Sequence, residues 1–392
     1  MKEPQIRFSL NKSSYERKRL NDIAKINPKS TLPESFEYVD LESVVGTEMK
    51  KHRKENKATA PSRAQRVAQK GDIFYQTVRP YQKNNLHFDL DSKDFVFSSG
   101  YAQIRSEINS EYLFTLLQQD KFLNQVIENC TGTSYPAINP SNLSRLVVNI
   151  STDIKEQQDI ADFFKTFDSY IHGISNKVTS LKQIKSACLQ SMFPQEGESF
   201  PKVRFKGFKE EWQEKSADSI FRTFNERNRP YLPVLSATQD KGMVKRESIG
   251  YNIFHDISNE ATYKHILPGQ FVIHLRSFQG GFAHSTIEGI ASPAYTVLDF
   301  IDKGQHSDLF WKYIFLSKDF IKRLELITYG IRDGRSISFD EVKQMSFLYP
   351  SVAEQQKIAA YFVNLDKQIS LQTLRLDKLK HIKASCLDKM FV

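Results

Sequence analysis

The stretch "IKEQQDIADFFKTFDSYI", which begins at Ile154, returns as "VAEQQKIAAYFVNLDKQI", which begins at Val352. With a constant offset of 198 residues, Glu156–Phe193 and Glu354–Phe391 are identical at 16 of 38 positions. Chance alone gives about two identities over such a stretch. The chain of 392 residues therefore contains an internal duplication, and each copy closes one half of it.

Both copies carry apolar residues at alternating steps of four and three, a heptad pattern that indicates one seam along a long helix. The predicted seam consists of Ile160, Phe164, Phe167, Ile171, Ile174, Val178 and Leu181 in the first copy and Ile358, Phe362, Leu365, Ile369, Leu376 and Leu379 in the second. A helix of about 38 residues is roughly 57 Å long. Because an unpaired seam of that length favours aggregation, we expect the two helices to pack on each other in antiparallel orientation. Two unrelated core helices are the less favoured interpretation.

The ends and the seam of each predicted helix hold matching polar residues. Asp153 and Ser351 each stand three positions before the first Glu of a copy, which is a capping signature. Lys185 and Lys383 occupy equivalent seam positions. These two lysines either set the register of the helix pair or extend to solvent.

Outside the helices the two halves repeat more weakly. "SYERKRLNDIAKIN" from Ser14 aligns with "EWQEKSADSIFRTFN" from Glu211, and strand-like stretches such as "DIFYQTV" and "QFVIHLR" alternate with helical ones such as "SEYLFTLLQQDKFLNQVIEN" and "SDLFWKYIFLSKDFIKRLELI". This pattern predicts an α+β fold with two pseudo-symmetric globular domains joined by two long antiparallel coiled-coil helices. The expected boundaries are 1–152 and 211–351 for the globular domains, 153–193 and 352–392 for the helical regions, and 194–210 for a surface linker.

Composition narrows the class of protein. The formal net charge of +9 and a pI near 9.1 favour a polyanionic partner. The three cysteines, Cys130, Cys188 and Cys386, form no CxxC pair, so neither a disulfide framework nor a zinc site is indicated. With no signal-peptide pattern and no run of about 18 apolar residues, we expect a cytoplasmic protein with no membrane segment.

The sequence holds no recognisable catalytic motif. A Walker A loop, an HExxH pair and a GxSxG elbow are all absent from it, and its nine histidines show no metal-ligand spacing. We therefore expect no catalytic residue and no metal site in this chain.

Basic, aromatic and hydroxyl residues in probable loops are the candidates for contact with DNA. A basic cluster suits phosphates, and arginines that follow matching strands in the two halves suit guanine. Solvated loops and structural ion pairs stay open as alternatives. The candidates are Lys50, Lys51, Arg53, Lys54, Arg79, Tyr81, Ser134, Tyr135, Arg276, Ser277, Arg332, Arg335 and Ser336.

Over essentially its whole length the chain resembles the specificity subunit of type I restriction-modification enzymes. The resemblance rests on the order and spacing of the two "EQQ.IA..F...D..I" helices, of "FPKVRFKGFKEEW" from Phe200 and of "PVLSATQDKGMVKR" from Pro233. It implies two target recognition domains that each read one half of a bipartite site in double-stranded DNA. It also implies that the paired helices act as a spacer, whose roughly 57 Å exceed the about 34 Å of one turn of B-DNA.

The same resemblance implies partners and no catalysis by this chain alone. Two methylation subunits, which modify adenine, dock on such a subunit, and restriction subunits join them. S-adenosylmethionine and ATP are then expected only on the partner subunits, and this chain is expected to hold no cofactor.

Apolar residues off the seam are the candidates for contact with the methylation subunits. They are Ile184, Leu189, Phe193, Ile382, Leu387 and Phe391. Two other classes stay open: a standalone nuclease with duplicated DNA-binding domains, and a coiled-coil interaction protein with no DNA role. Metal-dependent cleavage by the chain alone would favour the first, and a lack of salt-sensitive DNA binding would favour the second.

Overall fold

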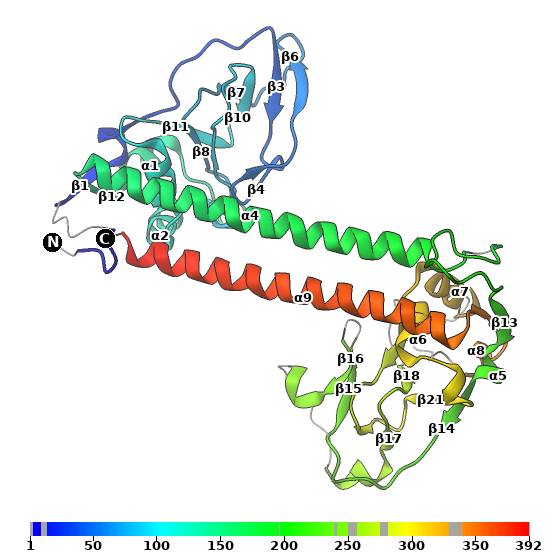
Figure 1. The fold of residues 1–392 in the computed structure, drawn as a ribbon. Coiled ribbons are helices and arrows are strands. Elements are labelled where there is room, and N and C mark those ends of the chain that lie inside the picture. The colour runs from blue at the N-terminus through cyan, green and yellow to red at the C-terminus, as the bar shows by residue number, and fades with distance from the viewer. Residues whose placement is uncertain are drawn as a thin grey trace. The chain divides into compact units, whose positions relative to one another are not determined.

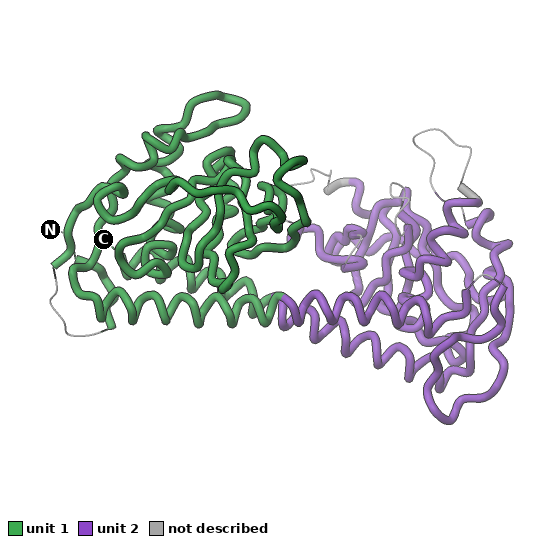
Figure 2. Tube along the Cα trace, turned by 90° about the horizontal axis from the view of Figure 1, so that it is seen from above, with its two compact units in different colours: residues 1–175, 374–392 green, residues 176–373 purple. Residues whose placement is uncertain are grey.

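The computed structural model forms two compact units, shown in two colours in Figure 2. Unit 1 comprises residues 1–175 and 374–392, and unit 2 comprises residues 176–373. The structure describes residues 3–8, 14–195, 197–238, 241–249, 257–274, 281–328, 337 and 339–391. Each unit contains sheets and helices of its own, so the predicted α+β class is confirmed.

The two long helices are present as predicted (Figure 1). Helix α4 runs over Ile154–Ser191 and helix α9 over Val352–Lys389, with 38 residues each. Unit 1 contains the first part of α4 and the last part of α9, and unit 2 contains the other two parts. The compact units therefore divide both helices, whereas the predicted boundaries keep each helix as one region.

Unit 1 places two four-stranded sheets around an aromatic core. Phe74 and Phe97, one from each sheet, stack with ring centroids 3.6 Å apart. One sheet has the order β2 (Ala24–Ile26), β11 (Tyr101–Ser106), β8 (Asp72–Gln76) and β9 (Leu86–His87). The other has the order β6 (Arg53–Asn56), β3 (Ser35–Val39), β10 (Phe95–Ser98) and β7 (Ala64–Val67). Two pairs complete the strands: β1 (Tyr15–Arg19) with β12 (Val147–Ser151), and β4 (Val44–Val45) with β5 (Glu48–Met49).

Unit 2 repeats much of this plan. The sheet β14 (Phe221–Phe224), β21 (Thr296–Phe300), β18 (Phe271–Ile273) and β19 (Phe282–His284) matches the order β2, β11, β8 and β9 of unit 1. The pair β13 (Gln213–Ser216) and β22 (Ser346–Tyr349) matches β1 and β12. Two further pairs are β15 (Leu235–Thr238) with β16 (Gly242–Lys245), and β17 (Lys264–Ile266) with β20 (Gly289–Ala291).

Both units also contain short helices. They are α1 (Ser110–Leu117), α2 (Asp120–Glu128) and α3 (Pro140–Arg145) in unit 1, and α5 (Ala217–Ile220), α6 (Asp308–Phe315), α7 (Lys318–Thr328) and α8 (Phe339–Val342) in unit 2. Short 3-10 turns cover Leu20–Asp22, Pro80–Gln82, Arg246–Ile249, Ile257–Thr262 and Lys303–Gln305. The stretch "SEYLFTLLQQDKFLNQVIEN" is helical as predicted, and it divides into α1 and α2 because Gln119 adopts extended backbone angles between them.

The "EQQ" start of each long helix ties that helix to its own globular part. The Gln157 side chain donates to the carbonyl of Ser151 at 2.8 Å, and the Gln355 side chain donates to the carbonyl of Pro350 at 2.9 Å. The same two side chains accept from the backbone N–H of Asn109 and of Ser307, the N-cap residues of α1 and α6. The repeated glutamine therefore satisfies buried backbone groups in both units, which explains a polar residue at this place.

Within each unit the two helix parts run antiparallel. In unit 1 Lys383 of α9 binds Asp168 of α4 at 2.5 Å, and in unit 2 Lys185 of α4 binds Asp366 of α9 at 2.5 Å. The two seam lysines thus form ion pairs across the helix pair and do not extend to solvent. All the predicted seam residues are buried or half-buried.

The end of each long helix is buried in a globular core. Phe391 lies against Tyr112 and Phe164 in unit 1, with ring centroids 5.6 and 6.2 Å away. Phe193 lies against Phe310 and Phe362 in unit 2, at 5.6 and 5.9 Å. The expectation that Phe193 and Phe391 offer surface to a partner was wrong, since both are core residues.

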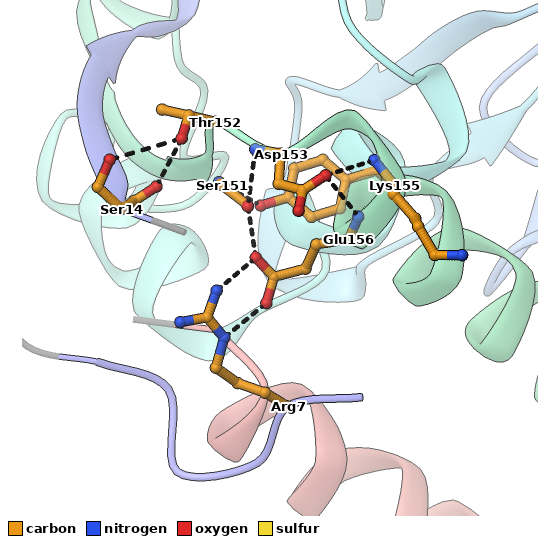
Figure 3. A network of polar contacts seen from close by, with 8 residues as sticks. Arg7, Ser14, Ser151, Thr152, Asp153, Lys155 and Glu156 are labelled. Carbon is orange, nitrogen blue, oxygen red and sulfur yellow. Dashed lines mark hydrogen bonds and ion pairs between the residues drawn. The ribbon is translucent and has the colours of Figure 1, made fainter. Parts of the chain in front are cut away.

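A repeat that the sequence analysis overlooked holds the helix ends together. "PQIRF" at residues 4–8 matches "PKVRF" at residues 201–205. Arg7 forms a two-bond ion pair with the buried Glu156 at 2.8 Å (Figure 3), and Arg204 does the same with Glu354 at 2.7 Å. The predicted surface linker 194–210 is therefore only partly a linker, because its arginine fastens the start of α9.

The backbone of the same five-residue repeat binds the other helix end. The N–H of Ile6 donates to the carbonyl of Lys389 in unit 1, and the N–H of Val203 donates to the carbonyl of Ser191 in unit 2. Each copy thus joins the start of one long helix to the end of the other within a single unit. The sequence already contains the pattern that predicts this contact, as a second short repeat at nearly the same offset as the long helical repeat.

Candidate nucleic-acid interface

A tight turn after strand β8 presents the first group of candidate residues. The turn Pro80–Gln82 is flanked by two residues with left-handed backbone angles, Arg79 and Lys83, both with φ of 54°. Such a conformation costs a non-glycine residue about 1–3 kcal/mol, and it persists only where neighbouring contacts hold it. Strained backbone of this kind gathers at binding and active sites.

Gln76, at the end of β8, supplies the contacts that hold the turn. Its side chain donates to the Gln82 side-chain oxygen at 2.8 Å and accepts from the N–H of Asn84 at 3.2 Å. Its own backbone N–H donates to the side chain of Asn85 at 2.8 Å. The sequence analysis missed this residue, although a buried glutamine in the otherwise apolar "DIFYQTV" was a visible signal.

A second loop, over residues 131–138, lies beside this turn. The N–H of Arg79 donates to the carbonyl of Pro136 at 2.8 Å, and the N–H of Ile138 donates to the carbonyl of Thr77 at 3.0 Å. Gly132 has a φ of 88°, and a Cβ there would lie 3.1 Å from the carbonyl oxygen of Tyr135. A glycine is therefore needed for the loop to close.

The two loops bring a cation and two exposed aromatic rings together. The guanidinium carbon of Arg79 lies 4.3 Å from the centre of the Tyr135 ring, within the range of a cation–π contact. Tyr135 is 64% exposed and Tyr81 is 51% exposed. Exposed aromatic rings beside an arginine suit contact with bases and phosphates. The structure thus brings Arg79 and Tyr135 into contact, while Tyr81 lies in the turn that follows Arg79 and the exposed Ser134 directly precedes Tyr135.

The predicted basic cluster differs from the expectation. Arg53 and Lys54 lie on strand β6 and not in a loop. Arg53 also pairs with two carboxylates, at 2.8 and 2.9 Å, while Lys50 binds Glu48 and Lys51 lies 3.8 Å from Glu42. Three of these four cations are already neutralised by neighbours, so this cluster is a weaker candidate for phosphate contact than the prediction assumed.

The candidates in unit 2 are not available for the same comparison. Arg276, Ser277, Arg332, Arg335 and Ser336 lie outside the described residues.

The candidates for contact with a partner subunit separate into three groups. Ile184 and Ile382 are 45% and 50% exposed on α4 and α9. Leu189 and Leu387 are half-buried against the cores of units 2 and 1. With Phe193 and Phe391 inside the cores, only the two isoleucines keep most of the exposure that a docking role requires.

The described residues show no feature that indicates catalysis or metal binding. The described part of the chain holds no group of three or more His, Cys, Asp and Glu side chains that could bind a metal ion. Burial raises the pKa of the Cys130 and Cys386 thiols, which disfavours the reactive thiolate. None of the helices in the described ranges is both long and apolar enough to cross a membrane.

Parts of the chain are similar to known type I specificity subunits. Residues 12–183 match the family model described as "Type I restriction modification DNA specificity domain". A stretch of 139 residues is 31% identical to the type I restriction enzyme HindI specificity subunit of Haemophilus influenzae and covers 34% of this chain. That stretch spans 30% of the relative's length. The resemblance to type I specificity subunits is confirmed by these matches.

Two solved structures share the fold. The S subunit of a type I restriction-modification system from M. genitalium covers 100% of this chain and 99% of its own, with a TM-score of 0.63 and 14% identity. A chain from a study of complex assembly and conformational transition of the type I R-M system covers 98% of this chain and 99% of its own, with a TM-score of 0.54 and 19% identity. At these identities the likeness concerns the fold.

Proposed function

Taking residues 12–183 as a type I restriction-modification DNA specificity domain, we propose that this chain is the DNA-reading subunit of a type I complex. Each unit reads one half of a bipartite target in double-stranded DNA. The chain performs no catalysis itself and binds neither S-adenosylmethionine nor ATP, which belong to the partner subunits. We expect it to work in the cytoplasm, where its DNA ligand is.

The observation that supports this proposal is a framework that recurs in two units whose sequences differ outside it. Equivalent contacts recur in the two units, as in the ion pairs of Lys383 with Asp168 and of Lys185 with Asp366. Outside that framework the loops diverge, so two similar units meet two different ligands. A split DNA sequence is a ligand of this kind, and the net charge of +9 suits its phosphates.

The long helices suit two further roles in this proposal. Helices of 38 residues set a spacing between the two half-sites. The exposed Ile184 and Ile382 stand at equivalent places on α4 and α9 and offer one docking position to each of two methylation subunits. Restriction subunits then join through the assembled complex.

A methylation map tests the proposal. The chain is co-expressed with its methylation subunit in a host that lacks DNA methylation, and modified adenines are mapped across the genome. We expect a two-part motif that disappears when the chain is omitted. Methylation without the chain, or a stable complex that modifies nothing, would contradict the specificity role.

A substitution in one unit refines the test. Arg79→Ala removes the cation beside Tyr135 and is expected to relax the motif in one half only. Arg53→Ala is the matched control, because Arg53 is exposed and already paired with carboxylates. Relaxation of both halves by Arg79→Ala would contradict the assignment of one half-site to each unit.

A further inference from the structure

Arg66 is a half-buried cation without a carboxylate partner. It lies on β7, an edge strand of its sheet, opposite Phe97 of β10. Its side chain donates from Nε to the carbonyl of Tyr101 at a long 3.5 Å. No ion pair forms at Arg66 with any residue that the structure describes, and burial lowers the pKa of its guanidinium.

Lys264 occupies the equivalent position in unit 2. It lies 198 residues after Arg66, as Gly269 lies 198 residues after Gly71, and both glycines have a left-handed φ, of 87° and 89°. Lys264 donates from Nζ to the carbonyl of Tyr295 at 2.5 Å. It too has no ion pair within the described ranges, and burial together with the nearby Arg227 lowers its pKa.

The same feature thus occurs twice, although the residue type differs. A partly buried cation is costly unless an anion compensates it. Two other partly buried cations have such a partner, Arg105 with Asp72 and Arg204 with Glu354, whereas Lys312 lies against the Tyr313 ring. A neutral donor would be enough to bind the carbonyl oxygen. The positive charge at both positions therefore indicates that the anion belongs to a ligand.

The surroundings of Arg66 place it beside the candidate reading surface of unit 1. Its donor reaches Tyr101, and the adjacent Gly100 accepts from both the N–H and the hydroxyl of Thr77, at 3.0 and 2.7 Å. Thr77 stands two residues before Arg79. The carbonyl of the exposed Arg63 accepts from the N–H of Ser99 in the same turn. The backbone segments that carry Arg63, Arg66 and Arg79, none of which has an ion pair among the described residues, therefore meet near the turn between β10 and β11.

We propose that Arg66 and Lys264 are equivalent phosphate-contacting residues, one in each unit, which hold the DNA backbone while neighbouring loops read bases. The inference rests on the proposed function and adds a named backbone contact to each half-site. Such contacts position a protein on the duplex without regard to sequence. Neutralising one phosphate accounts for a slope of about −0.9 in a plot of log affinity against log salt.

The experiment measures that slope for the full chain in complex with its methylation subunits. The probes are a duplex that carries the mapped target and a duplex of scrambled sequence. Arg66→Met and Lys264→Met should each make the slope shallower by about 0.9. The ratio of wild-type affinity to variant affinity should then be about eight times larger at 0.1 M salt than at 1 M salt. The loss should be similar on both duplexes, and the melting temperature of the free protein should stay equal or rise.

Lys57→Met is the matched control, because Lys57 is an exposed lysine already paired with Glu34. It removes the same charge and should leave the slope near that of the wild type. If Arg66→Met or Lys264→Met behaves like this control, the inference is overturned.

Two further variants distinguish the loss of a phosphate contact from a change in folding. Arg66→Lys keeps the charge and should keep the slope, whereas Arg66→Gln keeps a neutral donor and should lose it. Equal slopes for these two variants would show a structural role only. A wild-type complex that binds neither duplex would overturn the proposed function together with the inference, whereas selective wild-type binding with unchanged variant slopes would overturn the inference alone.

Discussion

Replacing Phe391 by Ala should destabilise unit 1, although Phe391 stands almost four hundred residues from the start of the chain. Phe391 is 3% exposed and packs against Tyr112 and Phe164. Truncating a buried Phe costs about 3–5 kcal/mol, because the transfer free energy of the ring is lost and a cavity remains. With an m-value of about 2 kcal/mol per molar urea, the unfolding midpoint of unit 1 should fall by about 2 M.

The assay can separate the two units because both tryptophans of the chain, Trp212 and Trp311, lie in unit 2. Tryptophan fluorescence then follows unit 2, and far-ultraviolet circular dichroism follows the whole chain. For Phe391→Ala we expect an early transition in circular dichroism and an unchanged transition in fluorescence. Phe193→Ala should shift the fluorescence transition instead, because Phe193 lies 6.4 Å from Trp212.

Ile382→Ala is the control for the same helix, since Ile382 is half-exposed and should cost less than about 1 kcal/mol. An effect of Phe391→Ala no larger than that of the control would refute the packing described for unit 1. A fluorescence transition that moved as far as the circular dichroism transition would refute the assignment of Phe391 to that unit.

Three further substitutions test the described contacts, with urea unfolding followed by tryptophan fluorescence in each case. Arg204→Met leaves the carboxylate of Glu354, which is 1% exposed, without its partner and should lower the free energy of unfolding by about 3–5 kcal/mol. The double variant Arg204→Met with Glu354→Met should recover most of that stability. Equal losses in the single and double variants would contradict the pairing. Burial lowers the pKa of His306 from 6.5 to about 4. As pH falls from 6.5 to 4, the unfolded chain therefore binds the proton before the folded chain does, and the free energy of unfolding decreases. After allowance for solvent screening this loss is about 2 kcal/mol, and His306→Gln should abolish it; the same pH dependence of stability in wild type and variant would contradict the assignment. Gly242→Ala places a Cβ 2.2 Å from a backbone oxygen of β19 and should destabilise unit 2 by about 3 kcal/mol. Gly173→Ala, in an open helix position of unit 1 and therefore followed by far-ultraviolet circular dichroism, should stabilise that unit by up to about 1 kcal/mol. Similar values for the two would contradict the described turn.

The candidate reading surface was only partly predictable from sequence. Arg79 and Tyr135 were named from the turn and glycine patterns around them, but their 4.3 Å contact depends on how the turn after β8 meets the loop 131–138. The basic cluster from Lys50 to Lys54 looked available because like charges are adjacent in sequence. Its neutralisation by Asp40, Glu42, Glu48 and Glu55 depends on strand pairing and side-chain reach, which a charge pattern does not contain.

Local signals do not show where a helical stretch divides when no strong helix breaker is present. The apolar pattern over residues 110–129 suits one helix, yet the chain turns at Gln119 and continues as a second helix. No proline or glycine marks that break. The packing of both helices in the core of unit 1, seen in buried Tyr112 and Phe122, selects the turn.

The amino-acid sequence by itself determined the two long helices, their apolar seam and the duplication of the framework, because heptad spacing and repeated identities are properties of the chain alone. The tertiary structure decided which helix end enters which core, so that Phe391 completes unit 1 and Phe193 completes unit 2. It also decided which cations find a carboxylate and which, as Arg66 and Lys264, do not. The physical reason is that a periodic pattern defines the face a helix buries, whereas the identity of the partner depends on contacts between residues far apart in the chain.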